Sequence, residues 1–293
     1  MIIVIKNKYL RLAVDTLGAQ MMELTAQSGQ QYLWNGDPDY WKDRAPNLFP
    51  YVGRFTQGRY TLNGVSYNMG IHGFAASMEF DVVEQNESSV SFLLKSNTRT
   101  AEQYPFDFSF QITYTLEGNT VKICYEVENR SKSVMPFGLG GHPGFCVPFE
   151  KDTVFTDYYL RFCCPSYPSR VGHTPSCFLS GVDSPYLLEE DSVLWLKHSL
   201  FDDDAVVLKN MAREVALCCV GSARKIIVSY PQMPYLGIWH WPKKDAPYVC
   251  IEPWTSLPSR QDVVEEFLCK SDLIHLAPGG SYCNSWSITI EEE

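Results

Sequence analysis

Short runs of β-branched and aromatic residues, separated by turn signals, recur along this chain and constrain its fold more than any other feature. Val, Ile, Tyr, Phe and Thr gather in these runs from the first residues to the last. Such residues favour extended backbone, and Gly, Pro and Asn between them end each strand. Over 293 residues, this alternation predicts an all-β protein built as a large antiparallel β-sandwich.

Two hairpins are the clearest of these patterns. Residues 59–62 and 65–67 flank Asn63-Gly64, a pair that supplies the two positive φ angles of a type I′ turn. A second hairpin is predicted from residues 108–116 and 120–128, around Glu-Gly-Asn at 117–119. Further strands are predicted at residues 10–14, 158–164, 215–220, 225–230, 236–241, 248–252 and 286–290.

Helical signals are few. Residues 39–43 indicate a turn, and residues 259–268, which begin with Ser259 as a possible N-cap, predict one short helix. Neither is long enough to form a second domain. The segment 165–185 is rich in Pro, Ser and Gly, which is typical of a long surface excursion between strands. We therefore expect a single domain over residues 1–293.

Charge and hydropathy exclude several kinds of partner. The formal net charge is -10 and the chain has no run of Lys or Arg, so it would repel a phosphate backbone and nucleic acid is not expected. The apolar run at residues 2–5 is too short for a signal-peptide core, and no stretch approaches the ~20 apolar residues of a membrane span. These patterns predict a soluble cytoplasmic protein, and they leave open whether it forms a homodimer.

The ten cysteines occur singly or as the adjacent pairs Cys163-Cys164 and Cys218-Cys219, without a Cys-x-x-Cys motif. Neighbours on a strand point to opposite faces, so each pair is expected to aim one thiol inward and one outward. We expect reduced thiols that act as small hydrophobic side chains, with no zinc site, redox site or other metal site.

Four polar residues stand in segments marked by glycine or proline. They are Arg54, His72, His142 and Glu252, in the segments 49–55, 71–74, 140–145 and 251–254. Proline after Glu252 favours extended backbone at the end of an apolar strand. Taken alone, Glu252 could equally be a surface residue at a strand end, Arg54 a surface ion-pair partner, and each histidine a loop residue bonded to backbone.

Together the four segments resemble the aldose 1-epimerase (galactose mutarotase) family, in particular its LacX-like branch. The resemblance runs nearly end to end, from residues 32–38 to residues 285–288. It implies a sandwich with a sugar site in a concave cleft on one sheet. It also implies an isomerase that interconverts the α and β anomers of a free aldose without a cofactor or metal.

The resemblance also implies roles for individual residues. Glu252 would be the general base on the C1 hydroxyl, and His142 the general acid at the ring oxygen. His72 and Arg54 would orient the sugar. Asp204 would hold sugar hydroxyls, although the triplet Asp202, Asp203 and Asp204 leaves that register open.

Aromatic rings beside the motifs offer apolar surface to a sugar. Trp239, Trp254, Phe74 and Phe145 lie there, and among them we expect only Trp254 to line the cleft. Four further histidines match no motif of the family and are interpreted as structural or surface residues: His173, His198, His240 and His275.

Two departures from the family pattern concern specificity. Ala76 stands where the branch commonly has arginine, and residues 255–258 replace a glycine-bearing continuation. We expect a neutral sugar rather than a sugar phosphate, because the motifs contain few cations. The alternatives are a carbohydrate-binding or sensing protein on the same scaffold, and an epimerase of a hexose phosphate.

Overall fold

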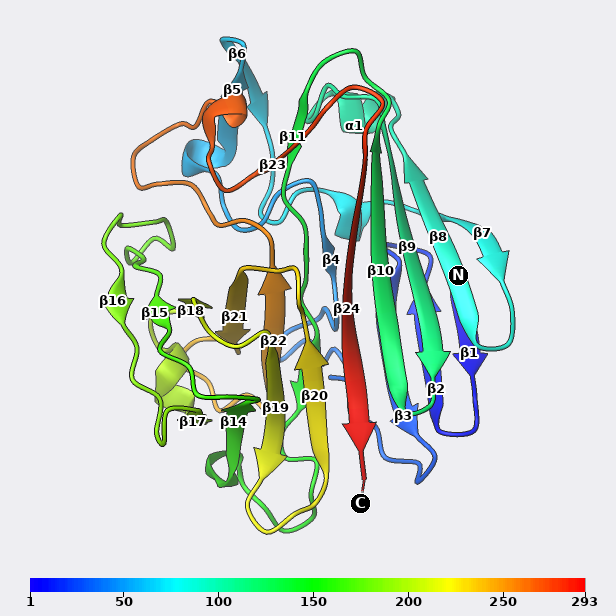
Figure 1. Ribbon diagram of the computed structural model, residues 1–293, viewed down its shortest axis with the longest axis vertical. Helices are drawn as coiled ribbons and strands as arrows, with labels where there is room; N and C mark the ends of the chain where they lie inside the picture. The colour runs from blue at the N-terminus through cyan, green and yellow to red at the C-terminus, as the bar shows by residue number, and fades with distance from the viewer. Residues whose placement is uncertain (293) are drawn as a thin grey trace.

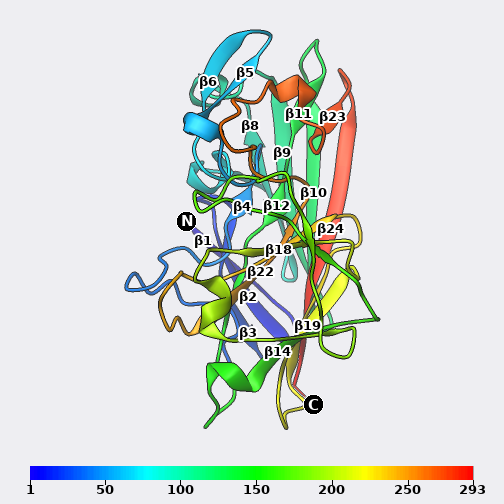
Figure 2. The same cartoon turned by 90° about the vertical axis from the view of Figure 1, so that its left-hand side faces the viewer.

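Antiparallel β-sheet makes up nearly all the regular structure in the computed structural model, which describes residues 1–292. Two large sheets pack face to face, and three small sheets flank them (Figures 1 and 2). The nine-stranded sheet has the order β17 (Val193–Trp195), β14 (Tyr158–Phe162), β19 (Glu214–Cys219), β20 (Lys225–Ser229), β24 (Ser281–Glu291), β10 (Thr120–Asn129), β9 (Phe108–Glu117), β8 (Ser89–Lys95) and β7 (Asp81–Gln85).

The second large sheet carries the segments singled out by sequence. Its order is β16 (Ser184–Pro185), β15 (Ser169–Arg170), β18 (Val206–Lys209), β21 (Tyr235–Trp239), β22 (Tyr248–Trp254), β12 (Gly140–Gly141) and β4 (Asn47–Leu48), and β13 (Gly144–Cys146) also pairs with β22. The small sheets are β1 (Ile2–Lys6), β2 (Leu10–Asp15) and β3 (Gln20–Ala26), then β5 (Arg59–Leu62) with β6 (Val65–Asn68), and β11 (Met135–Phe137) with β23 (Ile274–Leu276).

Helical structure is confined to short turns within residues 1–292. The one α-helix there is α1 (Thr98–Ala101), and none of the helices is long and apolar enough to cross a membrane. The 3₁₀ turns are η1 (Thr56–Gly58), η2 (Ala75–Ser77), η3 (Phe155–Asp157), η4 (His198–Phe201) and η5 (Phe267–Cys269).

The predicted all-β sandwich and its strands are confirmed. The hairpin β5–β6 turns at Asn63 and Gly64, with φ of 51° and 78°, as a type I′ turn requires. The hairpin β9–β10 pairs Glu117 with Thr120. The other predicted strands correspond to β2, β14, β19, β20, β21, β22 and β24, with boundaries that differ by one or two residues at most ends and by five at the start of β24.

The helix predicted over residues 259–268 is wrong. Its backbone instead pairs with neighbouring segments: Ser259 N–H donates to Arg54 O, and Thr61 N–H donates to Glu265 O. Only η5 is helical there. Two consecutive valines also oppose helix, because β-branched side chains lose rotamer freedom in a helical turn. The turn predicted at residues 39–43 forms slightly earlier, with the Tyr40 and Trp41 N–H groups donating to Asp37 O.

The segment 165–185 adds strands β15 and β16 to the edge of the second sheet, and its intervening loop lies beside β18. All ten cysteines are free thiols. Cys218 and Cys219 behave as expected of strand neighbours, one partly exposed and one buried. Cys163 and Cys164 do not, because they follow the end of β14 and both are exposed.

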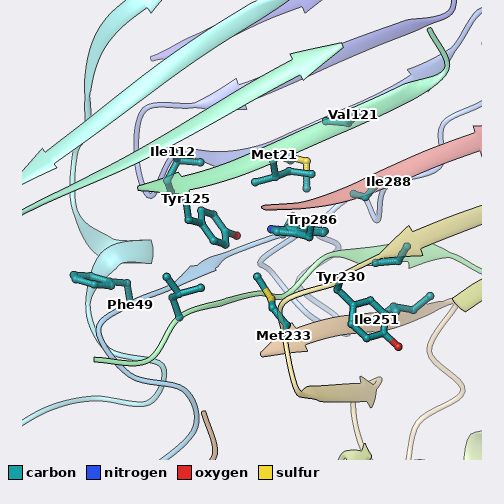
Figure 3. Packing of buried hydrophobic residues seen from close by; sticks show 14 of the residues in the cluster. Met21, Phe49, Ile112, Val121, Tyr125, Tyr230, Met233, Ile251, Trp286 and Ile288 are labelled. Atoms are coloured by element: carbon teal, nitrogen blue, oxygen red, sulfur yellow. The ribbon is translucent and has the colours of Figure 1, made fainter. Parts of the chain in front are cut away.

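The core fills the space between the two large sheets. Inward residues of β10 and β24, such as Tyr125 and Trp286, face Ile251 of β22 across this space (Figure 3). Every residue of β22 is buried. Its odd-numbered side chains, Val249 and Ile251, belong to the sandwich core, whereas Tyr248 and Cys250 belong to a separate apolar cluster on the other face.

This arrangement predicts a large effect of truncating Ile251, whose side chain is fully buried. Ile251→Ala should lower the free energy of unfolding by ~2–5 kcal/mol, because it removes buried methyl groups and leaves a cavity. Denaturant titration with tryptophan fluorescence would measure the change. The control is Val65→Ala, at a side chain that is 54% exposed, where a change within ~0.5 kcal/mol is expected. Equal effects of the two substitutions would contradict this assignment of the core.

Candidate functional site

A cavity of about 590 Å³ lies on the face of β22 opposite Ile251. Side chains on one face of a strand recur every second residue, and Glu252 and Trp254 accordingly both line this cavity. Loops from distant parts of the chain complete its walls. The cavity brings together all six residues nominated from sequence: Arg54, His72, His142, Asp204, Glu252 and Trp254.

Glu252 and His142 form a close pair in this cavity. His142 Nε2 lies 3.1 Å from Glu252 Oε2, and the two side chains are 9% and 2% exposed. Glu252 Oε2 is nevertheless buried without a hydrogen-bond partner among residues 1–292, and so is the other ring nitrogen of His142, Nδ1. Two buried polar atoms without partners are costly in a folded protein, and such atoms are available to a ligand.

Packing fixes the position of His142. Its backbone N–H donates to Pro46 O at 3.1 Å. Trp41 lies against its ring at a centroid distance of 4.9 Å, and Trp239 meets it edge-on at 5.6 Å. The preceding glycine allows the close approach of β12 to the core, since a Cβ on Gly141 would lie 2.4 Å from the Trp286 ring. Any larger residue at position 141 would therefore displace the Trp286 ring or the backbone that carries His142.

His72 is held in one tautomer by backbone. The Gly53 N–H donates to His72 Nδ1 at 3.1 Å, and the His72 backbone N–H donates to Gly53 O at 2.9 Å. Because Nδ1 accepts a hydrogen bond, the ring proton of neutral His72 is on Nε2. Burial, followed by the charge of Arg54, lowers the pKa of His72 to about 4. His72 is thus a neutral donor at the cavity wall.

Arg54 and Asp204 place opposite charges at the cavity. Arg54 is exposed and makes no ion pair within residues 1–292, so its guanidinium can meet a ligand. Asp204, at φ 77°, accepts a hydrogen bond from the Cys177 thiol at 2.7 Å. Of the three consecutive aspartates, Asp203 and Asp204 line the cavity, and Asp204 is the more buried.

The environment controls where protons reside in the Glu252–His142 pair. Burial, and then the Asp204 carboxylate, raises the pKa of Glu252 well above its ordinary value. Burial, and then His72, lowers the pKa of His142 well below its ordinary value. Both shifts disfavour charge, and a carboxyl group next to an imidazole in a desolvated site titrates as one unit. In their uncharged forms the two groups together carry one ionisable proton, that of the carboxyl group, in addition to the N–H of the neutral imidazole.

Several lining residues were not predicted from sequence. Trp239 lines the cavity as well as Trp254, and Trp41 reaches it from a loop that carries no motif. His173 was interpreted as structural or surface, but it lines the cavity together with Cys177. Both come from the loop between β15 and β16, and loop positions carry no periodicity that could have marked them.

The remaining aromatic and histidine residues lie away from the cavity. Phe74 and Phe145 are buried in the core. His198 Nδ1 lies 3.0 Å from His240 Nε2, and Phe155 stacks on His198, so this pair is structural. His275 is exposed and bonded to backbone carbonyls.

The two departures from the family pattern differ in their relation to the cavity. Ala76 lies in η2 and is not among the lining residues. Residues 255–258 are all buried, and the Thr255 hydroxyl is bonded to the Leu139 backbone. Pro258 lines the cavity and packs against Gly53. The replaced continuation therefore shapes one wall.

One group of possible metal ligands forms in the described part of the chain. His142, Cys250 and Glu252 each offer a ligand atom, and these three atoms lie within 4.8 Å of one another. All three residues are buried. The sequence showed no metal-ligand spacing, because the group forms only when β22 and the segment after β12 pair in the fold.

Comparison with known proteins agrees with this fold. The aldose 1-epimerase family profile matches residues 1–289. The chain is 32% identical to the chromosomal LacX protein of Lactococcus lactis over 99% of both chains. A galactose mutarotase related enzyme from Lactobacillus acidophilus superposes with a TM-score of 0.94 at 31% identity, covering 99% of this chain and 97% of the other.

A galactose mutarotase-like protein from Lactobacillus casei gives a TM-score of 0.93 at 30% identity, over 99% of this chain and all of the other. Fold and site together define a mutarotase-like sandwich with a carbohydrate-related function. The chain belongs to the aldose 1-epimerase family.

The protonation of His72 gives a testable prediction. Its ring should stay neutral, with the proton on Nε2, from pH 8 down to about pH 5, because its pKa is about 4. The unfolded state binds a proton near pH ~6.5, so His72 makes folding stability fall as pH drops from that value toward 4. Two-dimensional ¹⁵N NMR of the imidazole would show the tautomer. A cationic ring at pH 6, or a proton on Nδ1, would contradict it.

Proposed function

We propose that this protein is an aldose 1-epimerase that interconverts the α and β anomers of a free, uncharged aldose. The observation that carries the proposal is the desolvated Glu252–His142 pair, whose facing atoms lie 3.1 Å apart, beside a cavity with orienting donors and acceptors. We also propose a cytoplasmic location, in keeping with ten free thiols.

The reaction needs one acid and one base. A proton leaves the C1 hydroxyl, another reaches the ring oxygen, and the bond from C1 to that oxygen breaks. The aldehyde then rotates about the bond from C1 to C2, and the ring closes with the opposite configuration. Positioned acid and base groups each contribute ~10²- to 10⁴-fold. The pair meets this need because its two groups share one ionisable proton, so that one group can donate a proton while the other accepts one.

We assign the base to Glu252 and the acid to His142. A sugar hydroxyl that donates to Glu252 stabilises its carboxylate form and so moves the shared proton to the imidazole. Proton transfer from C1–OH to Glu252, and from His142 to the ring oxygen, then opens the ring. Reclosure reverses both transfers and returns the pair to its starting state, so no net proton is consumed.

The other lining residues would orient the sugar. His72 presents its Nε2–H, Arg54 an unpaired guanidinium, and Asp204 a carboxylate that accepts hydroxyl protons. The Trp254 ring offers an apolar surface to the C–H face of the sugar. Holding the substrate in this way converts proton transfer into an intramolecular step.

A carbohydrate-binding or sensing role is the alternative from another class. A protein that only binds a sugar needs hydrogen bonds that complement the sugar. Burial of a carboxyl group 3.1 Å from an imidazole costs free energy and does not improve such hydrogen bonds. Perturbed titratable groups in a cavity are more typical of catalysis. We therefore favour the enzyme.

Removal of either member of the pair should slow the reaction. Glu252→Gln and His142→Asn should each lower kcat by ~10²-fold or more while the protein stays folded. The measurement is anomer exchange by NMR or polarimetry across a panel of aldoses, with circular dichroism to check the fold.

Matched controls are Glu84→Gln and His275→Asn, at exposed positions outside the cavity. Both should retain the activity of the unmodified protein. If the unmodified protein and all four variants exchange every aldose at the uncatalysed rate, the catalytic proposal fails and the binding role takes its place.

The preferred substrate should be neutral rather than phosphorylated. The cavity is lined by five carboxyl side chains but only three Lys or Arg side chains, and one of these, Lys244, already donates to Asp39 O at 2.5 Å. A dianionic phosphate is usually bound by several cations. We expect kcat/KM to be higher for glucose or galactose than for the 6-phosphates. A tenfold preference for the phosphates would overturn this expectation.

A further inference from the structure

Cys250 is a buried thiol that the proposed reaction does not use. It lies two residues before Glu252 on β22, and the period of a strand therefore places both side chains on the same face. Glu252 lines the cavity there, and Cys250 lies in the adjoining apolar cluster with Trp41 and Tyr248. Its exposed fraction is 0%, and its thiol makes no hydrogen bond within residues 1–292. Its thiol sulfur, a Glu252 oxygen and a His142 ring nitrogen all lie within 4.8 Å of one another.

We propose that His142, Cys250 and Glu252 form a binding site for a soft divalent cation such as Zn²⁺, and that its occupation switches off the catalytic pair. The binding part of this proposal stands independently, whereas the inhibitory part rests on the proposed function.

The ligand set fits such an ion. Thiolate, imidazole and carboxylate are the groups that bind zinc in proteins, and adjacent ligand atoms around tetrahedral zinc lie about 3.5 Å apart. Side-chain rotations that move the ligand atoms by about 1 Å would therefore bring all three within bonding distance of one ion. A divalent cation with one thiolate, one carboxylate and one neutral imidazole gives a complex without net charge, which suits a buried site.

Unpartnered atoms at the same place support a ligand. Glu252 Oε2 and His142 Nδ1 are buried and lack hydrogen-bond partners among the described residues. An ion would bind a carboxylate oxygen of Glu252 and one of the two ring nitrogens of His142, and it would leave a fourth ligand position for water. Binding releases the Cys250 thiol proton and the single proton of the Glu252–His142 pair to solvent.

Occupation has a direct chemical consequence. With the ion bound, the pair has lost the proton that it shares, and the carboxylate electrons that would accept the C1 hydroxyl proton are bound to metal. Ring opening then lacks both its acid and its base. The metal and the aldose should accordingly compete for the same side chains.

Cobalt titration tests the site without reference to activity. The full-length protein, stripped of metal with EDTA and desalted, is titrated anaerobically with Co²⁺. We expect visible bands of four-coordinate cobalt and a near-ultraviolet thiolate-to-cobalt band that saturate at one equivalent. Cys250→Ser should lose the thiolate band. Cys250→Ala serves the same purpose if the serine variant does not fold.

Cys146→Ser is the matched control. Cys146 lies on β13, paired with β22, and its thiol donates to Leu33 O and does not belong to the group of possible metal ligands. This variant should keep the thiolate band. A band that persists in the Cys250 variants, or the absence of any band at one equivalent, would overturn the site.

Zn²⁺ inhibition tests the switch. Micromolar Zn²⁺ should suppress anomer exchange, EDTA should restore it, and the Cys250 variants should need at least tenfold more Zn²⁺ for half inhibition. Equal sensitivity of Cys250→Ser and the unmodified protein would overturn the inhibitory part. A Cys250-dependent cobalt band in a protein without exchange activity would instead retain the site and reject the proposed function.

Discussion

The two-residue period of β22, a strand buried on both faces, is the constraint on which the candidate site depends. Ile251 must face the sandwich core, since it packs among the side chains of the opposite sheet. Because side chains alternate along a strand, Cys250, Glu252 and Trp254 lie on the other face. A shift of the register by one residue would place a carboxyl group in the core. The folding free energy of the core therefore also fixes the position of the carboxyl group.

Desolvation changes the pKa values of the two groups that are held in this position. In water, a glutamate and a histidine side chain carry opposite charges between pH ~4.3 and pH ~6.5, but burial opposes charge on each, raising the pKa of Glu252 and lowering that of His142. The pair can then exchange one proton at little cost. The same burial underlies the proposed cation site, because the Cys250 thiol beside the pair has no hydrogen-bond partner among residues 1–292.

Local patterns predicted the strands, since alternation and Asn-Gly turns act over a few residues, as β5 and β6 show. The six nominated site residues came from motifs, and the fold brings all of them to one cavity. Trp41, His173 and Cys177 were not predicted to line the cavity, because they lie on loops whose course is fixed by long-range packing. The helix expected at residues 259–268 failed for the same reason, since distant backbone groups at Arg54 and Thr61 take its hydrogen bonds.

Floor and walls of the cavity come from different parts of the architecture. Glu252 belongs to a central strand that cannot change without loss of the core, whereas Trp41, His173 and Cys177 belong to loops that no sheet requires. Mutation can therefore remodel the walls without disturbing β22, whose opposite face packs in the core. Under the proposed function, such an architecture lets sugar preference change through substitutions in the loops while Glu252 keeps its place on the central strand.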